Sequence, residues 1–378
     1  MQILLIHSAK MDQPTGIVTH VCQLAASLAR KGHNVQVIMR GQQETEFIQN
    51  NVQFSLFSNF YKFYRAIAKQ KISSQIIHCH DILSLAACVP RGHRPYVYTN
   101  HSVFADPDFY LSYLEWQNIH RLNYKMRFKL KMTEVLGNYL LSGVKTIAVC
   151  EFVRTTISRI YGVPEPAIVV IYNGINTDDF QFNESKSEHK KSGRILFIKP
   201  NDSRKGLHHL MEAMPLVLEK VPDARLIAAG PEPEGEYRSY ILKLMNDYQI
   251  SDKVIFTGKI PFAKLVSCYQ SSDVVVMPSV YEAFPIVALE AGICGKPVIA
   301  SDVGGMREVI VDGYTGYCVN TKDPAIFANA ILALLQDRAV RIQMGEAAKQ
   351  RVIMNFTWEK ISADVERVYQ KAIGYYSE

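Results

Sequence analysis

The sequence predicts an α/β protein with two domains, each built on a doubly wound parallel sheet. The first observation is length, because 378 residues exceed one ordinary hydrophobic core and suit two domains of typical size. The second is that short apolar runs alternate with helical patterns along the chain. The third is that these runs are apolar on both faces, which is typical of parallel strands covered by helices on each side.

The apolar runs predict the strands in order. They lie at residues 3–6, 35–39, 76–77, 96–98, 146–149 and 169–171 in the first half, and at 195–198, 225–229, 253–257, 274–277, 297–300 and 316–319 in the second. The polar stretch 181–193 has loop composition and predicts the linker. We therefore expect domains at 1–185 and 186–357. An amphipathic helix over about 359–373 follows the sequence Phe356-Thr-Trp358.

Composition limits the classes of function. The chain has no run of 18 apolar residues and no basic leader before its first strand, so we expect neither a membrane span nor a signal peptide. Seven cysteines without a Cys-x-x-Cys pair favour a reducing cytosol, so we expect a cytoplasmic protein. Residues 1–185 carry eighteen Lys and Arg against thirteen Asp and Glu. That excess could attract an anionic acceptor or the inner face of a membrane; no nucleic-acid motif accompanies it.

Two carboxylates bracket the start of a short predicted helix. Pro285 stands where a first helical residue is expected, since its missing N–H would be unpaired there anyway. The next amides, of Ile286 and Val287, would then be open at a helix N-terminus, which suits a phosphate. Glu282 lies just before the helix and Glu290 about two turns along it. An anion site between two hydroxyl-binding carboxylates fits a sugar nucleotide.

The surrounding motif is more specific than this spacing. Pro-Ser-x-Tyr precedes the Glu-x7-Glu, and Gly-Lys-Pro-Val-Ile-Ala-Ser-Asp-Val-Gly-Gly follows at 295–305. Over residues 273–316 these motifs follow one another in the same order as in the retaining glycosyltransferases of family 4, which have the GT-B fold, and the segment resembles that family. The resemblance implies two Rossmann-like domains facing a central cleft, with a last helix, 358–378, that crosses back to the N-terminal domain. The alternatives are incidental surface glutamates on an ordinary strand and helix, and a terminal helix that stays on the second domain.

The resemblance also implies a donor site in the second domain. Lys205 matches a cation that binds the donor diphosphate. Lys199 stands where arginine is usual, and its ammonium cannot make the bidentate hydrogen bonds of a guanidinium. Arg204 either compensates or is solvated. Glu290 would take the ribose hydroxyls and Glu282 the sugar hydroxyls. The expected donor-binding set is Gly16, Lys199, Arg204, Lys205, Gly258, Ile260, Glu282, Ala283, Phe284, Ile286, Val287 and Glu290.

Two segments of the first domain resemble less specific parts of the family pattern. Gly16 remains of the usual glycine pair in the first turn, where Thr15 replaces its partner. His101 follows a predicted strand, where the family has a histidine beside the transferred sugar. His78 and His80 share one side of a strand and invite a metal interpretation, but no further ligand supports it. We expect no metal site, and expect His101, Glu282 and Lys205 to be the catalytic residues.

The implied activity is retaining, metal-independent transfer of a hexose-type sugar from a nucleotide-diphosphate sugar to a hydroxyl acceptor, without a cofactor. We expect a UDP-sugar rather than a GDP-sugar, and an acceptor that is lipid-linked or a precursor of a cell-surface glycan. Residues 104–141 interleave aromatic and basic side chains, a pattern that fits either peripheral membrane contact or a buried helix with a solvated basic face. A GT-B sugar-nucleotide epimerase and a non-catalytic sugar-nucleotide-binding protein are the alternatives, since Thr15, Lys199 and Pro285 depart from the family pattern.

Overall fold

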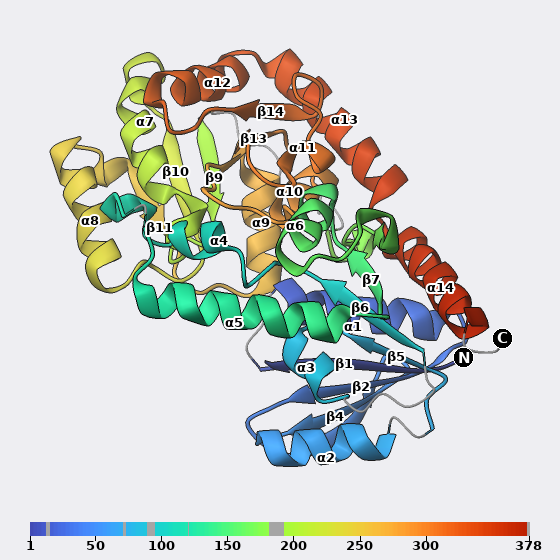
Figure 1. The fold of residues 1–378 in the computed structure, drawn as a ribbon. Helices are drawn as coiled ribbons and strands as arrows, with labels where there is room; N and C mark the ends of the chain where they lie inside the picture. The colour runs from blue at the N-terminus through green and yellow to red at the C-terminus, as the bar shows by residue number, and fades with distance from the viewer. Residues whose placement is uncertain (13–15, 71–72, 89–94, 120, 181–192, 376–378) are drawn as a thin grey trace. The chain divides into compact units, whose positions relative to one another are not determined.

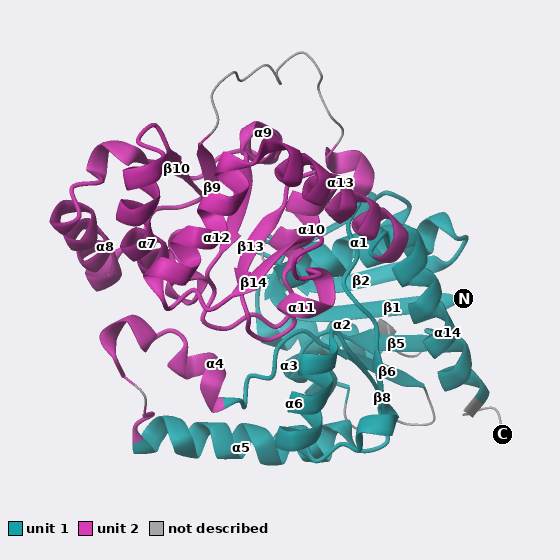
Figure 2. Cartoon of the chain, turned by 90° about the horizontal axis from the view of Figure 1, so that it is seen from above, with its two compact units in different colours: residues 1–106, 124–176, 356–378 teal, residues 107–123, 177–355 magenta. Residues whose placement is uncertain are grey.

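The computed structural model describes residues 1–12, 16–70, 73–88, 95–119, 121–180 and 193–375. The chain forms two compact units, which Figure 2 colours separately. The first unit comprises residues 1–106, 124–176 and 356–378, and the second comprises 107–123 and 177–355. Residues 107–123 therefore group with the second unit, whereas the predicted division placed them in the N-terminal domain. The predicted linker at 181–193 lies outside the described residues except for Gly193.

The first unit contains a sheet in the order β3-β4-β2-β1-β5-β6-β7-β8 within the described residues (Figure 1). Its strands are β1 (Gln2–Lys10), β2 (Asn34–Arg40), β3 (Thr45–Gln49), β4 (Val52–Phe57), β5 (Ile76–Cys79), β6 (Tyr96–Asn100), β7 (Lys145–Ala148) and β8 (Ile168–Val170). Its helices are α1 (Gly16–Arg30), α2 (Phe60–Gln70), α3 (Ile82–Ala86), α5 (Tyr124–Leu141), α6 (Glu151–Tyr161) and α14 (Trp358–Tyr375). Residues 3–7 of β1 are buried, as expected for a central parallel strand.

One edge of this sheet was not predicted. Strands β3 and β4 form an antiparallel hairpin, joined by Asn50 and Asn51 with φ of 51° and 60°. Asparagine tolerates this left-handed conformation, and consecutive residues of that kind make the turn that matches the twist of a hairpin. The residues of β3 are mostly exposed, so this strand lacks the apolar run on which the strand predictions depended. The Asn50-Asn51 pair was the sequence signal that could have predicted this hairpin.

The last helix, α14, belongs to the first unit and packs beside α1. The Ser27 hydroxyl donates to the Trp358 carbonyl oxygen at 3.2 Å and lies 2.9 Å from the Ser362 hydroxyl. Gly174 comes so close to the Trp358 ring that a Cβ there would lie 2.7 Å from it. The Ile175 amide also donates to the Phe356 carbonyl at 2.7 Å. The Tyr172-Asn-Gly-Ile turn therefore holds the start of α14 in place.

The second unit contains an all-parallel sheet in the order β11-β10-β9-β12-β13-β14 over its described residues. Its strands are β9 (Arg194–Ile198), β10 (Arg225–Ala229), β11 (Val254–Phe256), β12 (Val274–Met277), β13 (Val298–Ser301) and β14 (Gly316–Val319). Its helices are α4 (Pro107–Leu111), α7 (Leu207–Lys220), α8 (Gly235–Asp247), α9 (Phe262–Ser271), α10 (Ile286–Ile293), α11 (Met306–Val309), α12 (Pro324–Gln336) and α13 (Arg338–Asn355). The prediction of two parallel sheets is confirmed.

Candidate functional site

The second sheet reverses its strand order between β9 and β12. Chain order runs outward from β9 through β10 to β11 on one side, and from β12 through β13 to β14 on the other. In doubly wound sheets, ligands bind at the carboxyl ends of the strands beside such a reversal. Lys199 directly follows β9, and Pro278 directly follows β12. The two loops that start at these residues carry half of the twelve predicted donor-binding residues.

An ion pair joins these two loops. The Nζ of Lys205, after β9, lies 2.5 Å from Oε2 of Glu282, after β12. The two side chains are only 18% and 11% exposed. An ion pair of such limited exposure is screened less by salt than a surface pair. The structure thus brings together two of the three predicted catalytic residues, with the cation and the carboxylate paired to each other.

Glycines let the loops approach closely. Gly206 has φ of 74°, and a Cβ there would lie 1.8 Å from the Pro278 carbonyl oxygen. Gly304 has φ of 55°, and a Cβ there would lie 1.8 Å from the Glu282 carbonyl oxygen. The Gly305 amide donates to that same oxygen at 3.1 Å. The Gly304-Gly305 turn therefore supports the backbone of Glu282.

Glu290 lies on α10 and contacts the neighbouring helix α9. Its Oε2 accepts a hydrogen bond of 2.5 Å from the hydroxyl of the fully buried Tyr269. Burial raises the pKa of the Glu290 carboxyl above its ordinary value, and the Tyr269 hydrogen bond and the charge of Lys199 oppose that shift. Glu290 therefore offers a carboxylate in a desolvated setting, where a hydrogen bond from a ligand hydroxyl is strong.

The start of α10 differs from the prediction by one residue. The helix begins at Ile286, and Pro285 precedes it instead of being its first residue. The Ile286 amide donates to the Phe284 carbonyl at 3.0 Å, so it is not the open phosphate-binding amide that was predicted. Ala283 and Phe284 are buried. Ile286 and Val287 are half-buried.

The other predicted cations differ in their surroundings. Lys199 has φ of 61°, an uncommon conformation for a residue with a side chain. Counted over the whole residue, Lys199 is exposed. Its ammonium is nevertheless surrounded by protein, and this desolvation lowers the pKa of Lys199, as does the nearby charge of Lys205. The Arg204 guanidinium donates to both carboxylate oxygens of Asp202, at 3.1 and 2.7 Å. It also lies 4.3 Å from the Tyr113 ring centre. Arg204 is therefore paired with Asp202, and its side chain is only 20% exposed.

The loop that carries the predicted donor-binding residues Gly258 and Ile260 follows β11. Gly258 has φ of 64° and pairs with Gly230 in an isolated bridge. The Thr257 hydroxyl donates to the Gly258 carbonyl at 2.9 Å and accepts from the Gly230 amide at 3.2 Å. Ile260 is half-buried. These bonds fix the loop beside the carboxyl end of β10.

In the first unit, the predicted residues lie at the corresponding edge of the other sheet. Gly16 is the first residue of α1, and Thr15 lies outside the described residues. His101 directly follows β6, and its Nε2 lies 3.3 Å from Nδ1 of His80. His78, by contrast, uses both ring nitrogens, which lie 2.6 Å from the hydroxyls of Tyr369 and Thr99. His78 is thus part of the core.

A cluster that sequence reasoning missed lies in the second unit. The carboxylate of Glu115 is 2.9 Å from Nε2 of His208, 3.4 Å from Nε2 of His209 and 3.1 Å from Nζ of Lys322. Burial alone would raise the pKa of Glu115, but these partners hold it well below its ordinary value. His208-His209 follow Lys205-Gly206 after one leucine, and this position was the sequence signal that could have marked the two histidines. Nothing in the sequence pairs them with Glu115, 93 positions away.

Two family models cover nearly the whole chain. Residues 14–179 match the model described as Glycosyltransferase Family 4, and residues 178–351 match Glycosyl transferases group 1. An uncharacterized glycosyltransferase of Methanocaldococcus jannaschii is 31% identical over 386 residues, covering 95% of each chain.

Solved structures show the same architecture. Sucrose-phosphate synthase from Thermosynechococcus elongatus has a TM-score of 0.78 at 22% identity, covering 99% of both chains. Anabaena HepE, in complex with UDP and glucose, has a TM-score of 0.79 at 18% identity, covering 98% of this chain and 100% of its own. The fold is GT-B. The chain belongs to glycosyltransferase family 4, a retaining family whose members transfer sugar from a nucleotide sugar. Among the described residues, no helix is both long and apolar enough to cross a membrane.

Proposed function

We propose that this enzyme transfers a hexose from a UDP-sugar to a hydroxyl acceptor, without a metal ion at the diphosphate. The observation that carries the proposal is the ion pair of Lys205 with Glu282 at the strand reversal of the second sheet, beside Lys199, which feels the charges of both Glu282 and Glu290. A cation flanked by two carboxylates matches a diphosphate flanked by the hydroxyls of a ribose and a sugar. UDP is favoured because the HepE complex, of the same fold, holds UDP and glucose. Membership of a transferase family favours transfer over epimerisation or binding alone.

Each residue takes a distinct part in this proposal. The diphosphate displaces Glu282 from the ammonium of Lys205, and the released carboxylate then accepts hydrogen bonds from the sugar. Glu290 accepts from the ribose hydroxyls, and Gly258 and Ile260 border the base. Lys199 adds a second positive charge, whereas Arg204 acts through its bonds to Asp202, which position the loop.

The chemistry proposed for this site is electrostatic. As the bond from the sugar to the diphosphate breaks, negative charge grows on the leaving phosphate, and a preorganised cation there stabilises the transition state. The acceptor hydroxyl attacks from the same face, with a donor phosphate oxygen taking its proton. His101 would hydrogen-bond beside the transferred sugar. We assign donor binding to residues 186–357 and acceptor binding to residues 1–185 with 358–378.

UDP affinity is expected to fall as the pH is lowered below neutral. The ribose hydroxyls donate to an ionised Glu290, and the raised pKa of this carboxyl means that protonation starts at a higher pH than for an ordinary glutamate. Titrating UDP calorimetrically against wild type and Glu290→Gln at several pH values measures this. The variant should bind weakly and lack the acidic decline. An equal decline in both proteins would assign the pH dependence to another group.

Sugar transfer is expected to survive EDTA. Lys205 and Lys199 supply the positive charge that Mg²⁺ supplies where a metal binds the diphosphate. The measurement is UDP release from the donor in the presence of acceptor, before and after chelation. Complete loss of activity that Mg²⁺ or Mn²⁺ restores would refute the metal-free site.

We further propose that the acceptor is lipid-linked or otherwise anionic and is used at the inner, cytoplasmic face of a membrane. Helix α5 supports this because its outer face is apolar. Exposed apolar side chains recur every three or four residues along it: Tyr124, Phe128, Met132, Val135, Leu136 and Tyr139. Tyr124 is 81% exposed and Tyr139 69%. At 3.6 residues per turn, this spacing makes one continuous stripe.

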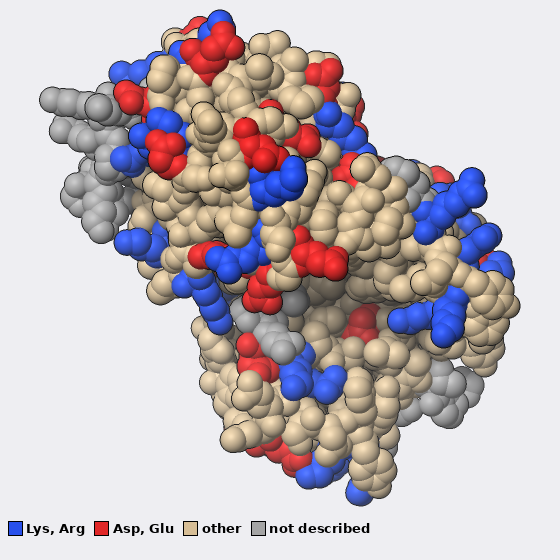
Figure 3. Space-filling model, turned by 90° about the vertical axis from the view of Figure 1, so that its left-hand side faces the viewer, with Lys and Arg blue, Asp and Glu red and all other residues tan. Residues whose placement is uncertain are grey.

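The opposite face of α5 is the one that packs into the first unit. Its buried residues are Leu130, Gly137, Leu140 and Leu141. Exposed basic residues accompany the apolar stripe: Lys125, Arg127, Lys129 and Lys131. An apolar stripe with cations beside it fits shallow insertion into an anionic lipid surface. On the face drawn in Figure 3, groups of Lys and Arg stand amid uncharged surface, with acidic side chains also present.

The protein is expected to sediment with anionic liposomes at low salt and less so at high salt, because salt screens the attraction of the basic residues. Replacing Phe128 and Tyr139 with serine should reduce sedimentation at both salt concentrations. Tyr248→Ser, a change at an exposed tyrosine of the second unit, is the control. A protein that ignores anionic liposomes at low salt would favour a soluble acceptor.

A further inference from the structure

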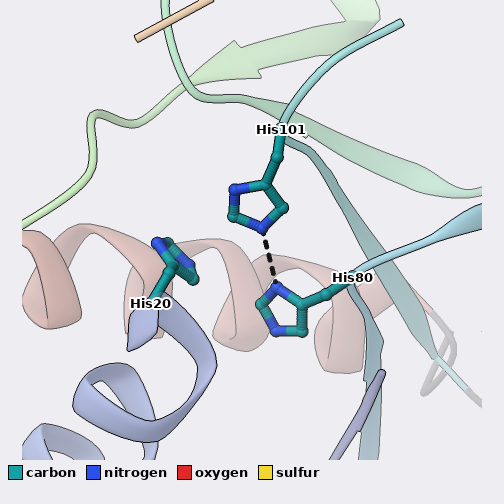
Figure 4. Close-up of side chains that lie close together, drawn as sticks. All are labelled: His20, His80 and His101. Carbon is teal, nitrogen blue, oxygen red and sulfur yellow. Dashed lines mark hydrogen bonds between the residues drawn. The ribbon is translucent and has the colours of Figure 1, made fainter. Parts of the chain in front are cut away.

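Three histidine side chains converge inside the first unit. His20 comes from α1, His80 directly follows β5, and His101 directly follows β6 (Figure 4). One ring nitrogen from each lies within 4.8 Å of the others. The residues are 5%, 2% and 9% exposed, respectively. Strands β5 and β6 pair in parallel, so their carboxyl ends meet at one edge of the sheet, and α1 brings the third ring to it.

The ring nitrogens of this cluster are short of hydrogen-bond partners. Among the described residues, Nε2 of His80 has no hydrogen-bond partner, and neither nitrogen of His20 makes a hydrogen bond of good geometry, although Asn173 lies close to its ring. Buried polar groups are nearly always satisfied in native proteins, so each exception requires an explanation. Neutral imidazole is the form that binds metal ions.

The spacing also fits a metal ion. Nδ1 of His80 and Nε2 of His101 are 3.3 Å apart. Two imidazoles on one tetrahedral zinc, each about 2.0–2.1 Å from it, place their nitrogens roughly 3.3–3.4 Å apart. The buried Asn173 lies close enough to His20 for its carboxamide to influence that imidazole. A carboxamide oxygen is the kind of acceptor that orients the second nitrogen of a metal-bound histidine.

We propose that His20, His80 and His101 form a binding site for a transition-metal ion of the Zn²⁺ type, with three imidazole ligands and a fourth position for water. This site goes beyond the proposed function, in which no metal acts at the diphosphate. His101 would bind the ion through Nε2, the nitrogen that faces His80, and keep Nδ1 for the sugar. The cluster of Glu115, His208 and His209 does not make a comparable site. Its carboxylate already faces two histidines and the ammonium of Lys322, and that positive charge opposes a cation.

Calorimetric titration of the chelator-stripped full chain with Zn²⁺ tests the proposal. We expect one equivalent to bind to wild type and His20→Gln to bind at least about tenfold more weakly, since even loss of an outer partner costs 10–100-fold. His33→Gln is the matched control: His33 lies in the same unit but bonds to Glu366 and the chain's N-terminus. Titration with Co²⁺ identifies the ligands, because thiolate ligation adds an intense charge-transfer band that imidazole ligation lacks.

Absence of stoichiometric Zn²⁺ binding by wild type would overturn the proposal. So would equal binding by His20→Gln, or a thiolate band in the Co²⁺ spectrum. His80→Asn provides a second ligand variant if His20→Gln fails to fold, as judged by its circular dichroism. The titration contains no sugar nucleotide, so a failure of the donor-site assignment would leave its outcome unchanged.

Discussion

Replacing Lys205 with alanine is expected to weaken UDP binding by roughly 10- to 150-fold, and to lower the transfer rate further. A hydrogen bond to a charged group contributes about 1.5–3 kcal/mol, and each 1.4 kcal/mol is tenfold in affinity. The rate should fall more than the affinity, because charge on the leaving phosphate is greatest in the transition state. Calorimetric titration with UDP and a kinetic assay with the UDP-sugar measure the two effects.

The ion pair of Lys205 with Glu282 supplies a discriminating control. Glu282→Gln releases the ammonium without removing it, so UDP, which carries no sugar, should bind at least as tightly as to wild type. Lys220→Ala, at the exposed pair of Lys220 and Glu219, should change nothing. Unaltered UDP affinity in Lys205→Ala would reject the assignment of the diphosphate to this lysine.

Gly304→Ala is expected to lower activity strongly and to destabilise the protein by about 3 kcal/mol or more. The substitution places a Cβ 1.8 Å from the Glu282 carbonyl oxygen, so the backbone that carries this carboxylate must move. Part of the cost is conformational, because a side chain in the left-handed region costs about 1–2 kcal/mol. The remainder comes from the overlap, in the range of costs of overpacking.

Gly313→Ala separates these two contributions. Gly313 has φ of 73°, but a Cβ there would meet nothing within 4 Å. It should therefore show the conformational cost alone and retain activity. Urea unfolding and the transfer assay, applied to both variants, measure the difference. If the two variants are equally stable and equally active, the Gly304 turn does not support Glu282.

Much of the fold could be predicted because parallel strands buried on both faces leave continuous apolar runs. The runs at 225–229, 274–277 and 316–319 match the strands residue for residue. The β3–β4 hairpin was missed because its exposed edge strand carries little apolar signal. The start of α10 was placed one residue early because Pro285 fits a first helical position, whereas the chain turns there first.

The site could be predicted where residues follow strand ends, and not where they meet through packing. Lys205 and Glu282 follow neighbouring strands, so the topology itself brings them together. The hydrogen bond of Tyr269 to Glu290 depends on how α9 packs on α10, which local sequence does not encode. His20 joins His80 and His101 from a helix, and no spacing in the chain indicates that meeting.

The central claim is that the second unit is a nucleotide-sugar site, and thermal unfolding in the presence of nucleotide sugars tests it most directly. A ligand at 100 times its Kd stabilises the native state by about 2.7 kcal/mol. We predict that UDP-sugars raise the melting temperature of wild type more than GDP-sugars do, and that Lys205→Ala and Glu290→Gln reduce the increase. If no nucleotide sugar stabilises wild type, or if both variants respond as wild type does, the claim is contradicted.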